Sequence, residues 1–287
     1  MNILDDLKLQ YKTGGMVQKL IFWNIGLFVG FSLLEVVLKL SNVAFSYFDF
    51  VALPSNTTEF LAKPWTLITF NFFHATIFHL IFNLLVLHFS GRLFNTYFTD
   101  KQLFGVYLLG GICSGLTFVS MYFILGKTSS LVGASGAIMA LLIATATYAP
   151  FMLLRIPLIG IVKLWHIAFV ILVIDLIQLP LENTGGHIAH LGGAFFGFVY
   201  IKFLKSGTDL TKPISALFDV LANAFKPTKK TPFKKVHRNT TKKNVNSFQQ
   251  NKDFTQKQID EILDKISKSG YDSLTKEEKE FLFKAGK

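Results

Sequence analysis

The chain of 287 residues has a single cysteine, Cys113, and only 16% of its residues are charged. One cysteine excludes an intrachain disulfide and a metal cluster held by several thiolates. The scarcity of charge, with 51% hydrophobic residues and a mean hydropathy of +0.43, is not typical of a water-soluble domain. The composition therefore predicts an integral membrane protein.

Acidic residues are scarcest near the C-terminus, where the positive charge gathers. The net charge is +11, and residues 205–250 contain ten Lys and Arg against two acids, Asp209 and Asp219. A basic segment that follows membrane spans favours contact with anionic lipid headgroups over contact with nucleic acid. We expect the lipid bilayer, and no nucleic acid, as a partner.

Apolar runs long enough to cross a bilayer are the dominant pattern of the first 205 residues. A spanning helix needs about 20 mostly apolar residues. The first run is too long for the core of a cleavable signal peptide, so we interpret it as an uncleaved span. The sequence predicts an all-α bundle of six transmembrane helices, near 19–40, 74–94, 103–125, 132–150, 162–180 and 186–204.

The charges of the connecting loops predict the orientation of these spans. Lys and Arg are more frequent in alternate loops, before span one and after spans two, four and six. Because such loops remain on the cytoplasmic side, both termini are predicted to be cytoplasmic. Spans two, four and six then all run from the outer side inwards.

The chain divides by composition into four predicted regions. These are a cytoplasmic N-terminal segment (1–18), the membrane domain (19–205), a basic interfacial or disordered linker (206–254) and a small helical hairpin (255–287). Residues 214–225 could form a short interfacial helix within the linker. Thr255 with Gln258, and Thr275 with Glu278, are typical of helix starts. The hairpin is too small for a sizeable core and is predicted to be a docking or regulatory appendage whose partner is unknown.

Span four opens with the sequence Gly133-Ala134-Ser135-Gly136. Small neighbours leave room for a substrate backbone to approach the Ser135 hydroxyl, and the start of a helix offers unpaired N–H groups where an oxyanion could form. A surface of small residues for helix packing is the alternative interpretation.

Span six carries His190 three residues before Gly193, and Gly197 follows four residues later. The two glycines form a small face for close helix packing, with His190 on the same side. Because spans four and six run in the same direction, Ser135 and His190 are predicted at similar depth. A hydroxyl and its general base must meet in this way.

Span two adds His79 and Asn83 on one helix face, with His74 nearer the outer side. An imidazole and an amide are suitable donors to an oxyanion held away from bulk water. The alternative is an interhelical hydrogen bond without a catalytic role.

Other polar residues of the spans receive no assigned role: Glu35, Asp175, His166 and His187. The spacing of His187 and His190 suggests a metal site with Asp175, but the sequence shows no third ligand at a suitable spacing. We therefore expect no metal and no cofactor. Glu35 and Asp175 are interpreted as snorkelling or interhelical groups.

Taken together, the three motifs resemble the rhomboid family of intramembrane serine proteases, in its bacterial members. The motifs are His74-xxxx-His79-xxx-Asn83, Gly133-x-Ser135-Gly136 and Ala189-His190-xx-Gly193-xxx-Gly197. The resemblance covers about residues 17–205 and implies a six-helix bundle with a water-accessible cavity that opens to the outer side.

The resemblance also implies roles for single residues. Ser135 would be the nucleophile and His190 the general base, a dyad without an acid. His79, Asn83 and the backbone N–H of Ser135 would form the oxyanion hole, supported by His74, Gly133 and Gly136. Two departures stand out: Met139 occupies a position where some members place an aromatic ring, and loop 41–63 lacks a clear Trp-Arg pair.

The implied activity is hydrolysis of transmembrane segments of membrane-protein substrates near the outer face, through an acyl-enzyme. The implied location is a bacterial inner membrane, with the site open to the periplasm. Two alternatives remain: a non-catalytic binder with the same fold, and a transporter of metal or small solutes. We find no internal or inverted repeat, and its absence disfavours transport.

Overall fold

The computed structural model describes residues 2–157, 159–181, 183–224 and 246–285. They form two compact units, Met1–Lys226 and Pro227–Lys287. The longer helices of the first unit are α1 (Ile3–Thr13), α2 (Met16–Leu40), α6 (Ile77–Phe94), α7 (Asp100–Leu125), α8 (Ser135–Tyr148), α9 (Leu164–Gln178), α10 (Thr184–Lys205) and α11 (Lys212–Ala224).

Each of the six predicted apolar segments contains a helix of this unit. Four of these helices, α2, α6, α7 and α10, are long and apolar enough to cross a membrane. Helices α8 and α9 have only 14 and 15 residues, which is roughly 21 to 23 Å at 1.5 Å per residue. This is shorter than a hydrocarbon core of about 30 Å.

The predicted bounds of spans four and five were therefore too wide. Gly133 has a φ of +129°, outside the helical region, so α8 begins only at Ser135. Pro150 disfavours helical backbone at Ala149, and α8 ends at Tyr148. Helix α9 begins later than predicted because residues Gly160–Lys163 form a strand, β4.

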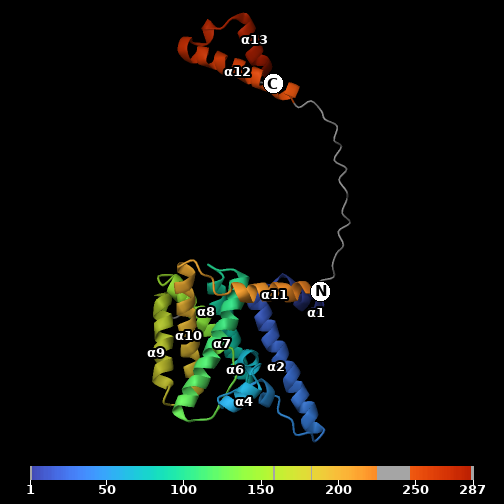
Figure 1. Cartoon of the computed structure of the whole chain (residues 1–287), viewed down its shortest axis with the longest axis vertical. Coiled ribbons are helices and arrows are strands. Elements are labelled where there is room, and N and C mark those ends of the chain that lie inside the picture. Colours follow the sequence, from blue (N-terminus) through green and yellow to red (C-terminus); the bar gives the residue numbers. More distant parts are fainter. Residues whose placement is uncertain (1, 158, 182, 225–245, 286–287) are drawn as a thin grey trace. The chain divides into compact units, whose positions relative to one another are not determined.

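Helix α8 lies inside the bundle, in contact with α6, α7, α9 and α10, as Figure 1 shows. Eleven of its 14 residues are buried. Helix α2 lies at one edge of the bundle, against α6 and α7, and α9 lies at the other, against α8 and α10. A helix enclosed by its neighbours does not have to match the bilayer thickness by itself.

The contact between α8 and α10 brings backbone against backbone. A Cβ added at Gly193 would overlap the carbonyl oxygen of Gly136, and one added at Gly197 would overlap that of Ala140. Small residues allow helices in a membrane to approach this closely and to gain dispersion contacts along their whole length. The two glycines thus fix the distance between the helices that carry Ser135 and His190.

Two short antiparallel sheets were not predicted from the sequence. Strand β1 (Leu53–Pro54) pairs with β2 (Ser130–Leu131), just before α8. Strand β3 (Leu153–Ile156) pairs with β4 (Gly160–Lys163) between α8 and α9. The first pair connects loop 41–63 to the segment that leads into Ser135.

Loop 41–63 lacks a clear Trp-Arg pair, and other side chains hold it in place. It contains helices α3 (Phe48–Val51) and α4 (Thr57–Ala62) and is followed by α5 (Thr66–Thr69) and the 3-10 helix η1 (Phe70–Phe72). Trp65 Nε1 donates to the carbonyl oxygen of Phe50 at 2.8 Å, and Thr69 Oγ1 donates to that of Val51 at 2.9 Å. Side-chain donors that follow the loop therefore bind its backbone.

The second unit is a helical pair made of α12 (Asn246–Ser269), η2 (Tyr271–Ser273) and α13 (Lys276–Ala285). Ile262 and Leu274 are its buried apolar residues among those described. Lys265 Nζ lies 2.9 Å from Glu278 Oε1, and Thr275 and Glu278 form the reciprocal bonds predicted for a helix start.

The predicted linker of 206–254 was wrong at its C-terminal end. Helix α12 begins at Asn246, so residues 246–254 are helical and Thr255 does not start a helix. Residues 246–254 contain no Pro or Gly. Their polar side chains therefore do not prevent α12 from beginning before its first apolar positions. Helix α11 begins two residues before the predicted 214–225, and residues 225–245 lie outside the described chain.

We predict that Gly193→Ala destabilises the bundle by about 1 to 3 kcal/mol, because the new methyl group must push α10 away from α8. Gly30→Ala in α2 is the matched control, since no atom lies within 4 Å of its added Cβ. Thermal unfolding in detergent measures both. Equal midpoints for the two variants would contradict the role given to this helix contact.

Asp209, in the loop between α10 and α11, is predicted to make the stability of the bundle depend on pH. Burial raises the pKa of Asp209, but hydrogen bonds from Thr211 and Gln102 outweigh it and lower that pKa below its usual value. The distances to Oδ1 of Asp209 are 2.9 Å from the Thr211 N–H and 2.7 Å from its hydroxyl. The stabilisation by ionised Asp209 is therefore fully present at a pH above the ordinary carboxyl pKa. It is lost as the pH falls through the lowered pKa that Asp209 has in the folded chain.

Asp209→Asn should lower the unfolding free energy at neutral pH by roughly 1 kcal/mol. The difference from wild type should shrink as the pH falls below the usual range of a carboxyl group. Thermal unfolding of wild type and Asp209→Asn, measured at neutral pH and at a pH below the usual range of a carboxyl group, tests this expectation. A difference that stays constant with pH would show that the charge of Asp209 contributes nothing.

Candidate active site

A cavity of about 410 Å³ lies among α6, α8, α9 and α10. Its lining brings together most of the polar residues that the sequence analysis selected, together with two that it left without a role. These residues are Ser135, His190, His79, Asn83, Asp175 and His187. Met139, Gln178 and Asn183 also line it.

Ser135 is the first residue of α8, and the residues before it set its position. Gly133 donates its N–H to the carbonyl oxygen of Phe70 at 2.9 Å, and its φ of +129° is rarely open to other residues. A Cβ at Gly133 would lie 2.8 Å from both Cε1 and Nε2 of His79. Glycine is therefore required for the turn and for the room that His79 occupies.

Gly136 also meets a close neighbour, on the side away from the cavity. A Cβ at this position would overlap the hydroxyl of Ser114 on α7. Gly133 and Gly136 thus allow the backbone around Ser135 to pack against α6 and α7.

His79 and Asn83 lie one turn apart on α6. Thr76 caps this helix, since its hydroxyl accepts the N–H of His79 at 3.2 Å. Asn83 Nδ2 donates to the carbonyl oxygen of His79 at 2.8 Å, and both side chains line the cavity. Each can present an N–H group to a bound substrate.

His74 lies before α6, and the prediction that span two begins at residue 74 was wrong because Thr76 caps the helix there. Its ring is buried and packs edge-on against His79, with 5.1 Å between ring centroids. It does not reach the cavity lining. His74 can hold the His79 ring in place by packing against it, but it cannot contact a substrate in the cavity.

Asp175 is the main residue that the sequence analysis left without a role. Its Oδ1 lies 2.8 Å from Nδ1 of His187 and 2.8 Å from Nδ1 of His190. Asp175 is on α9 and the two histidines are on α10, so it is an interhelical group. The predicted dyad histidine therefore contacts a buried acid.

The argument from ligand count against a metal was wrong, because the fold brings Asp175 of α9 against the two histidines of α10 as a third possible ligand. Asp175, His187 and His190 offer ligand atoms within 4.8 Å of one another. The expectation that no metal is bound stays a prediction.

Ser135 and His190 line the same cavity without a direct hydrogen bond between their side chains, within the described part of the chain. Catalytic hydrogen bonds are often long before substrate binds. Met139, one turn after Ser135, is buried at the cavity wall in the place of the aromatic ring. The arrangement is suited to nucleophilic attack by a hydroxyl assisted by an imidazole.

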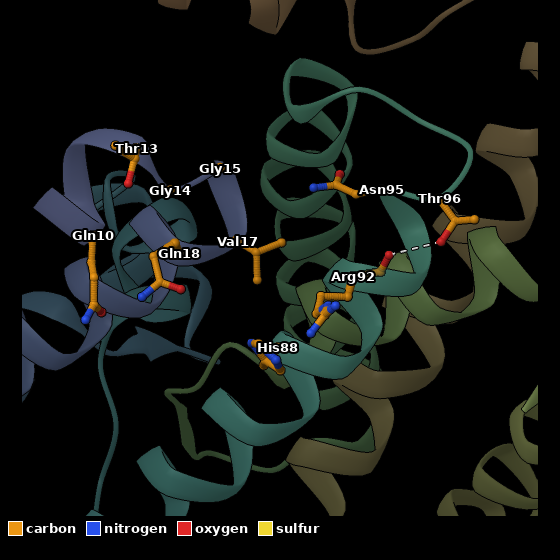
Figure 2. Close-up of a pocket in the computed structure, with 10 residues that line it drawn as sticks. All are labelled: Gln10, Thr13, Gly14, Gly15, Val17, Gln18, His88, Arg92, Asn95 and Thr96. Carbon is orange, nitrogen blue, oxygen red and sulfur yellow. Dashed lines mark hydrogen bonds between the residues drawn. The ribbon is translucent and has the colours of Figure 1, made fainter. Parts of the chain in front are cut away.

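A separate pocket of about 560 Å³ lies where α1 and α2 meet the end of α6, and Figure 2 shows its lining. It contains His88 and Arg92, but its hydroxyl groups are used within the chain. Thr13 donates to the carbonyl oxygen of Leu9 at 2.8 Å, and Thr96 donates to that of Arg92 at 3.2 Å. This larger pocket therefore lacks a free nucleophile beside a base.

The comparisons with known proteins identify the family of the first unit. The rhomboid domain matches residues 61–206. The chain belongs to the rhomboid domain family. Rhomboid proteins are generally intramembrane serine proteases, and the fold is the all-α rhomboid-like membrane bundle that the sequence predicted. Residues 246–284, in the second unit, match a family of unknown function, DUF6576.

Curated relatives are rhomboid-like proteins of vertebrates. The chain is 32% identical over 159 residues to presenilin-associated rhomboid-like protein A, mitochondrial, of Danio rerio, covering 54% of this chain and 40% of that protein. It is 34% identical over 153 residues to presenilin-associated rhomboid-like protein, mitochondrial, of Bos taurus (51% and 39%). For the human protein the identity is 31% over 151 residues (51% and 39%).

The chain thus spans about 40% of the length of these relatives. Because they are mitochondrial proteins, they do not support the bacterial membership expected from the motifs. This rhomboid domain is embedded in a membrane, and which membrane holds it stays a prediction.

Gly133 offers a test of how the cavity is built. We predict that Gly133→Ala lowers the free energy of unfolding by about 1 to 3 kcal/mol more than Gly126→Ala does, because the new methyl group must displace the His79 ring. Gly126 is the matched control, because its φ is +63° but nothing lies within 4 Å of an added Cβ. Thermal unfolding in detergent measures the difference. Equal losses would mean that backbone strain alone explains the glycine.

Proposed function

We propose that this chain is an intramembrane serine endopeptidase that cleaves transmembrane segments of membrane-protein substrates. Ser135 is the nucleophile and His190 is the general base in this proposal. The observation that carries it is the shared cavity, where a helix-start serine, an imidazole and two further N–H donors meet among membrane helices.

The first half of the reaction forms an acyl-enzyme. Ser135 Oγ attacks the substrate carbonyl carbon while His190 accepts the hydroxyl proton, which gives a tetrahedral oxyanion. Breakage of the C–N bond releases the amine, which takes the proton from His190. In the second half, water gives its proton to His190, its oxygen attacks the ester, and Ser135 leaves with that proton.

Donors for the oxyanion come from two helices. The N–H of Ser135 has no intrahelical partner because it opens α8. His79 and Asn83 line the same cavity from α6, and one of the two amide hydrogens of Asn83 is not needed for its bond to His79. Fixed donors around a developing negative charge are often the largest single contribution to catalysis.

Water has to reach the ester for the second half of the reaction. The His190 side chain is 22% exposed, and Ser135 is half-buried. Both groups are therefore open to the cavity, whereas the backbone around them is packed.

The location and orientation follow from the loop charges. We propose that both termini are cytoplasmic and that the cavity opens to the outer side, which is the periplasm if the membrane is a bacterial inner membrane. The mitochondrial names of the curated relatives are the reason to test the compartment separately. The helical pair at 246–285 is proposed to bind a partner that is not yet known.

We predict that purified full-length protein in proteoliposomes cleaves single-span test substrates, and that Ser135→Ala and His190→Ala each lower kcat by on the order of 10³-fold or more. A fluorophosphonate probe supplies a measurement that needs no known substrate, since it labels an activated serine. Wild type should be labelled and Ser135→Ala should not.

Ser206→Ala is the matched control, because Ser206 is exposed and its hydroxyl donates to the carbonyl oxygen of Phe203 at the end of α10. It should retain both labelling and cleavage. Equal product from wild type and Ser135→Ala would exclude the serine mechanism.

A further inference from the structure

The carboxylate of Asp175 faces two imidazoles in the interior of the bundle. Its Oδ1 lies 2.8 Å from Nδ1 of each histidine, and Asp175 is only 4% exposed. An ionised carboxylate only accepts hydrogen bonds, so an Nδ1 atom at this distance must carry a hydrogen. The geometry therefore assigns the Nδ1–H tautomer to His187 and to His190.

This tautomer decides which nitrogen of His190 is basic. A neutral imidazole has one N–H, so a hydrogen on Nδ1 leaves the lone pair on Nε2. Nε2 is on the opposite edge of the ring from Asp175, and Ser135 lines the same cavity. The nitrogen able to take the Ser135 proton is therefore the one that the acid leaves free.

We propose that Asp175 is a positioning residue that holds His190 in the productive tautomer and orientation, so that Ser135, His190 and Asp175 act as a triad. The inference rests on the proposed function and deepens it. It departs from the dyad without an acid that the family resemblance implied.

The turn between α9 and α10 fixes Asp175 opposite the two histidines. Thr184 donates its hydroxyl to the carbonyl oxygen of Leu179 at 2.8 Å, and the N–H of His187 donates to that of Asn183 at 3.2 Å. The first bond joins the end of α9 to the start of α10, and the second is the first backbone bond of α10 itself. Asp175 is thus held by the same turn that starts the helix of His190.

Asp175 also stabilises the positive charge that forms on His190 during the reaction. When Ser135 Oγ gives its proton to Nε2, His190 becomes a cation whose Nδ1 lies 2.8 Å from the carboxylate. A charge pair at this distance in a partly dry interior is worth far more than it is in water. Asp175 stays ionised throughout, and the proton returns from Nε2 to the leaving amine.

His187 fits this arrangement as a second donor to the same oxygen. It is buried, and its bond offsets part of the cost of holding a carboxylate among membrane helices. It does not need to contact the reacting atoms. We therefore expect its removal to cost less activity than removal of the acid.

A divalent metal held by Asp175, His187 and His190 is the competing interpretation. Bound to His190, a metal would remove its basic role or bring a different chemistry. We favour the triad because the two separations of 2.8 Å from the same oxygen are ordinary hydrogen-bond lengths.

The test compares Asp175→Asn and Asp175→Glu with wild type, all as full-length protein in proteoliposomes. Asn keeps the size but can offer N–H to Nδ1, which reverses the tautomer. We expect kcat to fall by roughly 10²-fold or more while KM changes little, since general-base catalysis contributes this much. Glu should recover part of kcat, and His187→Ala should lose less than Asp175→Asn.

Several outcomes would overturn the inference. Wild-type kcat in Asp175→Asn would exclude the triad, and so would a change in KM alone. Loss of activity on treatment with a chelator, restored by Zn²⁺, would establish the metal interpretation instead. If wild type itself does not cleave or react with the probe, the proposed function fails rather than the triad geometry.

A second measurement reads the tautomer in the wild-type chain. Histidine ¹⁵N NMR of the full chain, with His190 assigned by the loss of its signals in His190→Gln, reports which ring nitrogen carries the proton. At neutral pH we expect a protonated Nδ1 and an unprotonated Nε2. The reverse tautomer would contradict the inference whatever the activity of the variants.

Discussion

The close approach of α8 and α10 at their glycines sets the geometry of the cavity that contains Ser135 and His190. Gly193 lies over the carbonyl oxygen of Gly136, so no side chain separates the two helices. Ser135 and His190 are within one turn of this contact, on their respective helices. The spacing of the site is therefore fixed by main-chain atoms, which are stiffer than side chains.

The polar groups around the site need partners because the surrounding helices are apolar. Each unpaired buried group costs free energy. Asp175 Oδ1 accepts two N–H donors, and Asn83 donates to the carbonyl oxygen of His79. Asp175 Oδ2 and Asn83 Oδ1 are buried without a hydrogen-bond partner among the described residues. The hydrogen bonds that stabilise the fold thus also orient the groups that could react.

The sequence predicted the apolar helices from the length of the apolar runs, and it predicted a similar depth for Ser135 and His190 from spans that run in the same direction. Both residues line one cavity. The sequence did not predict the length of α8, which depends on a φ of +129° at Gly133. The start of α12 was missed because polar residues carry a weak helix signal. The contact of Asp175 could have been found: α9 and α10 follow each other in the chain as antiparallel helices, and Asp175 and His190 both lie within two turns of the connection between them.

Helix α8 carries Ser135, the proposed nucleophile, yet it has almost no surface towards the lipid. A bilayer that thickens or thins exerts its force on the helices that it touches. Here these are the surrounding helices, such as α2 and α9 at the two edges of the bundle. A change of lipid composition can therefore reach Ser135 only after it has moved a neighbouring helix, which shields the Ser135 hydroxyl from variation in the membrane.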